Sequence, residues 1–440
     1  MEQTNKINIP LFPILLVNFI GTLGFSIVLP FLVFVVTRFG GNALVYGIMG
    51  AVYPAFQLIG APVLGRWSDI YGRKKILFLS QAGTVAGWII FVIAVFVPVT
   101  VITSVNSSAL GIFSLTFPLI LLFLSRAVDG ITGGNISVAN AYLADITDEK
   151  NRNRNFGKMS VSSNLGFIAG PALAGLLGAT VYGELIPILA TVFLSLAAAV
   201  LIWFYLPESK PAEYSDNPND IKKVMGFENK ECFKQKDEKK IELKEVFKIP
   251  YISFILFLYF LIFLGFNFFY TAFPIHVLEK MKWTISQMGI YYSVLSLLMV
   301  IVQGPVLSRV SKKLSESVLI VAGNFILGIT FLMLLSENTY VIFGSTVFFA
   351  LGNGLMWPSV LSLLSKAAGK KYQGSVQGFA GSLGSLASII GLVLGGILYS
   401  AIGAMTFLIS AGVIYLVFVL SFRLLGIQKQ CDTNAALERA

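Results

Sequence analysis

Residues 65–75 read GRWSDIYGRKK, a short run with five charged residues between two long apolar segments, about 44–65 and 75–98. A membrane span needs about 20 mostly apolar residues, and both flanking segments meet that requirement. Gly65 and Gly72 permit a tight turn of the backbone between them. The stretch therefore predicts a polar turn that joins two membrane-spanning helices.

The same alternation of apolar segments and polar connections continues along the chain. Of the 440 residues, 56% are hydrophobic and 12% are charged, whereas soluble globular proteins carry about 25% charged residues. We therefore expect an all-α polytopic membrane protein with twelve transmembrane helices in two pseudo-symmetric six-helix bundles. The predicted spans are about 11–36, 44–65, 75–98, 115–143, 157–181, 185–206, 251–275, 285–308, 317–336, 340–365, 376–400 and 403–424.

The distribution of positive charge predicts the orientation. If both termini are cytoplasmic and the spans alternate, 28 of the 32 Lys and Arg residues face the cytoplasm, and only Arg38, Lys280 and Lys282 face outside. This asymmetry follows the positive-inside rule. The net charge of +10 is therefore explained by the Lys and Arg residues of the cytoplasmic connections, and we expect no nucleic-acid partner. We expect a multi-pass protein of the plasma (inner) membrane in contact with lipid.

The two halves are separated by a polar stretch and share a repeated pattern. Residues 207–249 hold ten lysines and ten acidic residues, a composition typical of a flexible tether, although a docking role stays open. Four glycines recur at an offset of 221, and PVLGRWS (62–68) recurs as PVLSRVS (305–311) at an offset of 243. The glycine pairs are 133/354, 157/378, 170/391 and 175/396. Parallel repeats are typical of transporters. The predicted domains are 1–206, 207–249, 250–425 and 426–440.

Arg126 and Asp129 are two charges deep inside an apolar segment. At about 1.5 Å per residue, Arg126 lies about 28 Å along the helix from Asp145, which marks the cytoplasmic end. Their spacing of three residues puts them on one helix face, where each partly neutralises the other. A charge at this depth costs about 2.5–3.5 kcal/mol on insertion scales and usually marks a substrate or ion pathway. A buried pair that only fixes helix packing is the alternative.

The polar turn carries a family motif. Gly65, Asp69, Gly72, Arg73 and Lys74 fit the order G-x-x-x-D-x-x-G-R-K/R, and here the chain resembles the major facilitator superfamily. The resemblance implies a major facilitator fold and a cytoplasmic latch that stabilises one alternating-access state. We expect Arg73 to pair with a carboxylate such as Asp145, and Asp69 to accept from a helix N-terminus in the other half. In the second half Lys312 takes the place of Asp69, so we expect a latch in the first half only.

The fourth predicted span carries a second match. Arg126, Gly130 and Gly134 fit the superfamily pattern R-x-x-x-G-x-x-x-G, which in proton-coupled members is associated with proton transfer. The first span has Asn18 and no acidic residue, so Asp129 is the carboxylate available for proton coupling. Burial favours the neutral form of a carboxyl group, and a neighbouring guanidinium favours its charged form. Protonation and substrate can therefore compete for the pair.

The fifth predicted span, NLGFIAGPALAGLLG (164–178), resembles the antiporter motif of the same superfamily. The motif residues are Gly166, Gly170, Pro171 and Gly175, with Ala174 in place of one glycine. Small residues recur every fourth position from 166, which predicts close helix packing. The motif is typical of exporters, and residues 141–160 resemble the corresponding loop of tetracycline and related drug/proton antiporters. A generic packing face is the alternative.

These features predict a secondary transporter, most simply a proton-coupled exporter of a small amphipathic, drug-like or tetracycline-like compound. A proton-coupled importer or metabolite transporter of the same fold is the alternative, and a membrane-embedded enzyme or receptor is a remote one. We expect no enzymatic activity, metal or cofactor, with the proton gradient as energy source. The oligomeric state stays open, with a monomer as the simplest. Candidate substrate-cavity residues are Asn18, Thr22, Tyr53, Gln57, Asn267, Tyr270, Asn353 and Trp357.

Overall fold

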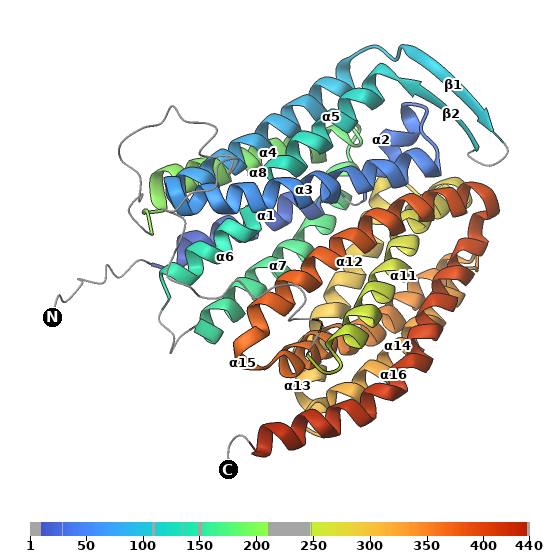
Figure 1. Ribbon diagram of the computed structural model, residues 1–440. Coiled ribbons are helices and arrows are strands. Elements are labelled where there is room, and N and C mark those ends of the chain that lie inside the picture. The colour runs from blue at the N-terminus through green and yellow to red at the C-terminus, as the bar shows by residue number, and fades with distance from the viewer. Residues whose placement is uncertain are drawn as a thin grey trace. The chain divides into compact units, whose positions relative to one another are not determined.

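Long apolar helices account for most of the chain in the computed structural model, which describes residues 10–28, 30–107, 111–133, 135–147, 152–209, 247 and 249–437 (Figure 1). Among these residues, ten helical stretches are long and apolar enough to cross a membrane, and Phe12–Ser26 is a shorter apolar helix. The last of the ten, Val376–Lys429, contains the predicted spans 376–400 and 403–424. The expected all-α membrane fold is therefore confirmed.

The helices of the first half overlap the predicted spans. They are α1 (Phe12–Ser26), α2 (Leu32–Arg38), α3 (Ala43–Tyr71), α4 (Arg73–Phe96), α5 (Phe117–Thr132), α6 (Asn135–Asp145), α7 (Arg152–Gly178) and α8 (Leu185–Tyr205). However, α3 continues to Tyr71, and the predicted span 115–143 is divided between α5 and α6. The predicted span 11–36 is divided between α1 and α2. Pro30 lies between the two helices, and its nitrogen has no hydrogen to donate to the helical ladder.

The helices of the second half are interrupted at glycine and proline residues. They are α11 (Ile252–Glu279), α12 (Ile285–Ile301), α13 (Leu307–Val310), α14 (Glu316–Met333), α15 (Thr339–Ile402) and α16 (Thr406–Leu437). A π-helical turn containing Pro305 joins α12 to α13. The long α15 is broken at Gly369, whose φ of 62° is non-helical, so it comprises the two predicted spans 340–365 and 376–400.

Residues 101–107 and 111–116 form two strands that the sequence analysis does not predict. Strands β1 (Val101–Ser107) and β2 (Gly111–Thr116) pair as a two-stranded sheet, visible as the arrows in Figure 1. The segment is rich in valine, isoleucine, serine and threonine, and β-branched residues favour strands. The connection between α4 and α5 is therefore a hairpin, and the all-α description applies to the spans.

The described chain divides into two compact units. The first comprises Met1–Val35, Val52–Ile102 and Thr116–Lys234, and the second comprises Val36–Ala51, Thr103–Leu115 and Gln235–Ala440. The second unit thus includes segments that the sequence analysis assigns to the first half. Within it, Gly396 packs against the backbone of Ala43 and Leu44. Most of the predicted linker 207–249, namely 210–246 and 248, lies outside the described residues.

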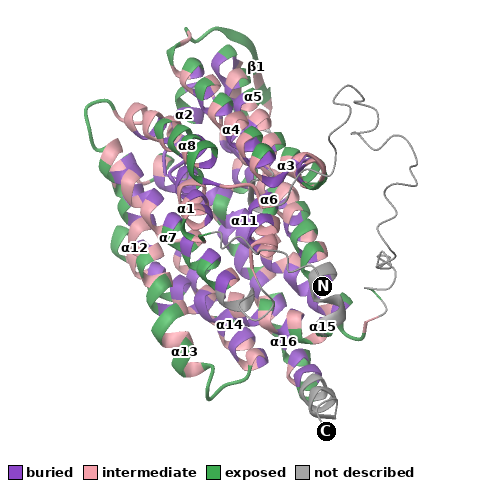
Figure 2. Ribbon diagram, turned by 90° about the vertical axis from the view of Figure 1, so that its left-hand side faces the viewer, coloured by how far each residue is buried: buried purple, intermediate pink, exposed green. Residues whose placement is uncertain are grey.

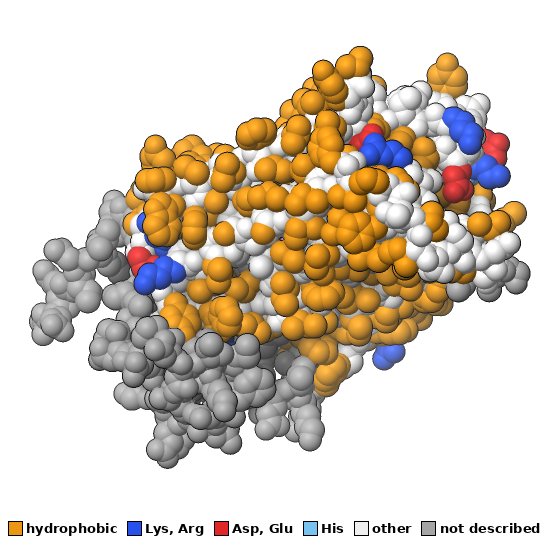
Figure 3. All heavy atoms as spheres, turned by 90° about the horizontal axis from the view of Figure 1, so that it is seen from above, with side chains coloured by type: hydrophobic (Ala, Val, Ile, Leu, Met, Phe, Trp, Pro, Cys, Tyr) orange, Lys and Arg blue, Asp and Glu red, His pale blue; other side chains and the backbone are white. Residues whose placement is uncertain are grey.

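Buried and exposed residues occupy different sides of the helices (Figure 2). In the first unit, Leu77 of α4, Tyr142 of α6 and Ile202 of α8 are fully buried in one apolar cluster. On the face shown in Figure 3, hydrophobic side chains cover most of the described surface, and few charged side chains interrupt them. A surface of this kind suits a hydrocarbon environment, as expected for an integral multi-pass membrane protein.

Candidate functional site

The two intramembrane charges form an ion pair in the first unit. Arg126 Nη2 lies 3.5 Å from Asp129 Oδ2, and the side chains are only 4% and 7% exposed. Both residues lie within the candidate span Phe117–Asp145. The i,i+3 spacing on α5 puts them on one helix face, so the structure brings together the pair that the sequence singles out.

Aromatic rings from α4 surround the guanidinium. The Arg126 Cζ atom lies 4.5 Å from the ring centre of Trp88 and 5.6 Å from that of Phe91. A desolvated cation over an aromatic face gains about 2 kcal/mol. Nevertheless, Nε and Nη2 of Arg126 have no hydrogen-bond partner among the described residues. The pair is therefore stabilised by charge and ring contacts, while part of its hydrogen-bonding capacity stays unused.

Close approaches of neighbouring helices position the pair. The Ser125 hydroxyl donates to the carbonyl oxygen of Gly87 at 2.8 Å, which joins α5 to α4. A Cβ atom on Gly87, also on α4, would lie 3.2 Å from the Asp129 Cβ atom, so glycine lets α4 approach the pair. A Cβ atom on Gly130 would lie 2.6 Å from the carbonyl oxygen of Tyr53, so glycine at this position lets α5 pack directly on α3. Gly134, the last motif position, lies outside the described residues.

Two of the candidate cavity residues lie beside this site. Gln57 Nε2 donates to Tyr53 Oη at 3.2 Å and to the Gly133 carbonyl oxygen at 2.8 Å. Both side chains belong to α3 and face the end of α5. Since the Tyr53 ring also packs 5.3 Å from that of Phe25 of α1, this corner combines polar atoms with aromatic surface.

The predicted antiporter motif forms the contact between α1 and α7. A Cβ atom on Gly166 would lie 2.8 Å from the carbonyl oxygen of Phe19, and one on Gly170 would meet the Ser26 hydroxyl and lie 2.8 Å from the Ile27 nitrogen. The Ser26 hydroxyl also donates to the Gly166 carbonyl oxygen at 2.9 Å. Small residues thus let the two backbones approach. Pro171, Ala174 and Gly175 are buried on the same helix.

Asn18 is part of this helix contact. Its amide nitrogen donates to Ser163 Oγ at 2.7 Å and to the Met159 carbonyl oxygen at 3.1 Å. The Thr22 hydroxyl donates to the Asn18 carbonyl oxygen within α1. The side chain of Asn18 therefore holds α1 to α7 through its amide nitrogen.

The candidate residues of the second unit have separate surroundings. Asn267 of α11 donates to Ser388 Oγ of α15 at 3.1 Å, much as Asn18 joins α1 to α7. The Trp357 ring packs against Tyr259 and Phe263 at 5.3 and 5.1 Å. Tyr270 is 38% exposed. Asn353 Nδ2 lies 3.9 Å from Met299 Sδ. Aromatic surface dominates here, which suits an amphipathic ligand.

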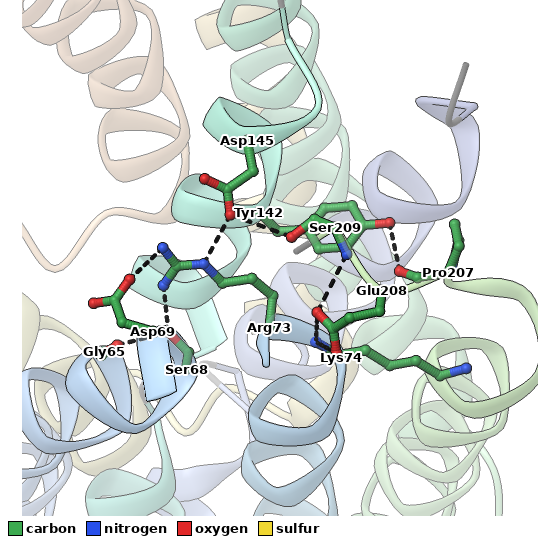
Figure 4. A network of polar contacts seen from close by, with 10 residues as sticks. All are labelled: Gly65, Ser68, Asp69, Arg73, Lys74, Tyr142, Asp145, Pro207, Glu208 and Ser209. Carbon is green, nitrogen blue, oxygen red and sulfur yellow. Dashed lines mark hydrogen bonds and ion pairs between the residues drawn. The ribbon is translucent and has the colours of Figure 1, made fainter. Parts of the chain in front are cut away.

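The predicted latch residues form a network at the turn between α3 and α4 (Figure 4). Arg73 contacts Asp69 Oδ1 at 2.5 Å through Nη2 and Asp145 Oδ2 at 3.0 Å through Nε, and its Nη1 donates to the Ser68 hydroxyl at 2.6 Å. Ser68 in turn donates to the Gly65 carbonyl oxygen. The Arg73 side chain is 9% exposed, whereas that of Asp69 is 63% exposed. Arg73 thus ties α4 to the ends of α3 and α6.

Glu208 is a member of the network that the sequence analysis does not predict. Its two carboxylate oxygens each lie 3.2 Å from the backbone nitrogen of Lys74, in the first turn of α4. An acidic group is stabilised at a helix N-terminus. Gly72 has a φ of 99°, and a Cβ atom there would lie 2.9 Å from the Glu208 carboxyl carbon, so glycine is required for both the turn and the contact. No local pattern links Glu208 to residues far upstream.

Replacing Arg73 with methionine is expected to destabilise the first unit. Removing one partner of a buried ion pair is strongly destabilising, at a cost of about 3–5 kcal/mol. Thermal melting of the purified protein checks the loss. Lys75→Met is the matched control, because Lys75 is exposed on the same helix turn. Equal melting temperatures for the two variants would contradict this role.

Comparisons with known proteins agree with this architecture. The sequence pattern described as the Major Facilitator Superfamily matches residues 14–317 and 255–436. The chain is 31% identical over 398 residues to Multidrug resistance protein 1 of Bacillus subtilis (strain 168), which covers 90% of this chain and 89% of that protein. It is 28% identical over 359 residues to the class C tetracycline resistance protein of Escherichia coli, with 81% and 80% of the chains covered.

Solved transporter structures share the fold. The D-xylose–proton symporter superposes with a TM-score of 0.71 at 14% identity, covering 93% of this chain and 97% of that one. The human organic anion transporter MFSD10 (TETRAN) superposes with a TM-score of 0.61 at 19% identity, covering 95% of this chain and 100% of that one. The family pattern matches most of the sequence. The chain therefore belongs to the major facilitator superfamily of membrane transporters.

Proposed function

We propose that this transporter exports a small amphipathic compound in exchange for protons, by alternating access. The observation that carries the proposal is the buried Arg126–Asp129 pair, 3.5 Å apart inside a membrane span. A charge pair at that depth is expensive and is typical of ion or substrate pathways. Arg126 Nε is buried with no hydrogen-bond partner among the described residues, and it is a donor that a substrate can satisfy when the site opens.

Competition at Asp129 supplies the coupling. When Asp129 is ionised, it neutralises Arg126, and when it takes up a proton, Arg126 loses its counter-charge. A substrate that occupies the site in one protonation state and leaves in the other is exchanged for a proton. The first span holds no acidic residue, so the exchange depends on Asp129.

The export direction rests on α7 and on the relatives. Gly166 and Gly170 give α7 the backbone contact that the exporter-type motif predicts. The relatives bear the names tetracycline resistance protein and multidrug resistance protein, and export of the drug is one way in which a transporter confers resistance. A compound with an apolar body and a polar group fits the aromatic surface beside Tyr53 and the charge pair on α5.

A proton-coupled importer is the second candidate. The D-xylose–proton symporter has the same fold, and a fold of this kind hosts many functions. Its low sequence identity of 14% transfers no substrate or direction to this chain. Export is favoured because both relatives above, at 28% and 31% identity, bear resistance names.

The proposed setting is the plasma (inner) membrane, with both termini cytoplasmic and the protein acting as a monomer. The excess of Lys and Arg in the predicted cytoplasmic connections supports this orientation. The substrate partner is a small molecule, and the coupling ion is H⁺ rather than Na⁺.

A panel efflux assay tests the function. Inside-out vesicles carrying the protein are loaded with a proton gradient, acidic inside, and offered tetracycline, cationic dyes and sugars in turn. We expect gradient-dependent accumulation of at least one amphipathic compound, and its loss when the gradient is collapsed. If right-side-out vesicles accumulate a sugar while protons flow inward down their gradient, that result would favour import instead. A response to Na⁺ alone would contradict proton coupling.

A further inference from the structure

A second polar network joins three helices of the second unit. Glu316 begins α14, and its Oε1 lies 2.5 Å from Lys366 Nζ and accepts from the Ser362 hydroxyl at 3.1 Å, both on α15. Gln428 of α16 donates through Nε2 to Glu316 Oε2, and its Oε1 accepts from the Ser317 backbone nitrogen at 2.7 Å. The start of α14 is thus held to α15, just before its break at Gly369, and to α16.

The internal repeat places this network at the same positions as the network of the first unit. At the offset of 243 that relates residues 62–68 to 305–311, Arg73 corresponds to Glu316. At the offset of 221 that relates the glycines of the two halves, Asp145 corresponds to Lys366. In each unit the two corresponding residues form an ion pair, at 3.0 Å in the first and 2.5 Å in the second. The positions are equivalent, and their charges are exchanged.

The third residue of each network, Glu208 in the first unit and Gln428 in the second, accepts a hydrogen bond from a backbone nitrogen in the first turn of a helix. In the first unit Glu208 accepts from the backbone nitrogen of Lys74, and in the second unit Gln428 accepts from that of Ser317. Ser317 is the equivalent of Lys74 at the offset of 243, and Glu208 follows the last helix of its half while Gln428 lies near the end of α16. Each acceptor satisfies an N–H group that the first turn of a helix leaves without a partner.

Because the charges of the pair are swapped relative to the first unit, the second network does not match the family motif. Lys312 stands where Asp69 stands in the first copy, so the motif G-x-x-x-D-x-x-G-R-K/R is absent and the expected latch is one-sided. The structure nevertheless shows an ion pair at the equivalent position, between Glu316 and Lys366. Two opposite charges attract whichever position carries the positive one. Reversing the sign of the charge at both positions therefore keeps the ion pair but removes the match to the motif.

We propose that Glu316, Lys366 and Gln428 are positioning residues that form a second latch, equivalent to the first but of opposite polarity, which holds the turn before α14 during the transport cycle. The proposal rests on the transport function proposed above. Its geometric part, the paired charges and the N-terminal contact, stands independently of substrate and coupling ion.

Charge reversal at this pair provides the test. Glu316→Lys places two positive charges together, Lys366→Glu places two negative charges together, and the double variant restores attraction with the polarity of the first unit. The Lys366 side chain is 45% exposed. A partly exposed ion pair of this kind changes the equilibrium constant between two conformations by a factor of about two to five. We expect each single variant to lower turnover by about that factor with the KM unchanged, and the double variant to recover it. Lys313→Glu, an exposed site nearby, is the control.

Two readouts separate this proposal from the proposed function. Amide hydrogen exchange at Ser317 reports the network without any substrate, and we expect it to rise in Gln428→Ala and Glu316→Lys. Turnover of a compound found in the panel assay reports the latch. Unchanged turnover in both single variants, or a double variant as impaired as the sum of the singles, would overturn the proposal. If only proton coupling failed, the amide hydrogen-exchange results at Ser317 would be unaffected. That outcome would contradict the role proposed for Asp129 and not the second latch.

Discussion

Proton-driven transport is expected to be lost when Asp129 is replaced by asparagine. One pH unit across the membrane supplies about 1.4 kcal/mol per exchanged proton, which supports about tenfold accumulation. Asparagine preserves the size of the side chain but cannot bind or release a proton. Uptake of a panel compound into vesicles, with and without a pH gradient, should therefore show tenfold stimulation in the wild type and none in Asp129→Asn.

Two companion variants make that result interpretable. Glu337→Gln makes the same chemical change at an exposed carboxylate outside the spans, and it should retain the stimulation. Arg126→Ala removes the counter-charge of Asp129 and should weaken binding of the compound itself, measured by equilibrium binding in detergent. Gradient stimulation in Asp129→Asn equal to that of the wild type would refute a coupling role for the carboxylate.

The second large effect is expected at the contact between α1 and α7. In Gly170→Ala the added methyl group would meet the Ser26 hydroxyl and lie 2.8 Å from the Ile27 nitrogen and 3.0 Å from the Leu23 carbonyl oxygen. Two of these three neighbours are backbone atoms, so the helices have to separate. Overpacking of this kind costs about 1–3 kcal/mol or more. We expect a clear fall in melting temperature and in the yield of folded protein.

Gly157→Ala is the matched control on the same helix. A Cβ atom at Gly157 would meet no atom within 4 Å, and alanine favours a helix over glycine by about 1 kcal/mol. This variant should be as stable as the wild type or more so. If the two variants melt alike, the close packing of α1 on α7 is not what requires glycine at position 170.

The sequence was sufficient to predict the features that depend on local patterns. Hydropathy placed the spans because each must bury about 20 residues in hydrocarbon. The spacing of Arg126 and Asp129 put both on one face of α5, and a single turn of helix then brought them within 3.5 Å. The ion pair between Arg73 and Asp145 followed from opposite charges at the same ends of successive spans.

Features that depend on contacts between distant segments could not be predicted in this way. Glu208 reaches the start of α4 across 134 residues of sequence, and only the packed helices show the contact. The role of Asn18 was also hidden, since a polar residue in a span can face either a cavity or a neighbouring helix. Its bond to Ser163 is made by tertiary packing, and the network at Glu316 became visible only when the repeat was read together with the structure.

Direct measurement of proton movement tests the central claim, that Asp129 couples transport to the proton gradient. Purified protein is reconstituted into liposomes that enclose a pH-sensitive dye, with no imposed gradient, and tetracycline or another compound identified in the panel is added outside. We predict that wild-type protein moves protons in the direction opposite to the compound, and that Asp129→Asn moves the compound down its gradient without protons. Substrate-dependent proton movement by Asp129→Asn at the wild-type ratio would contradict the account.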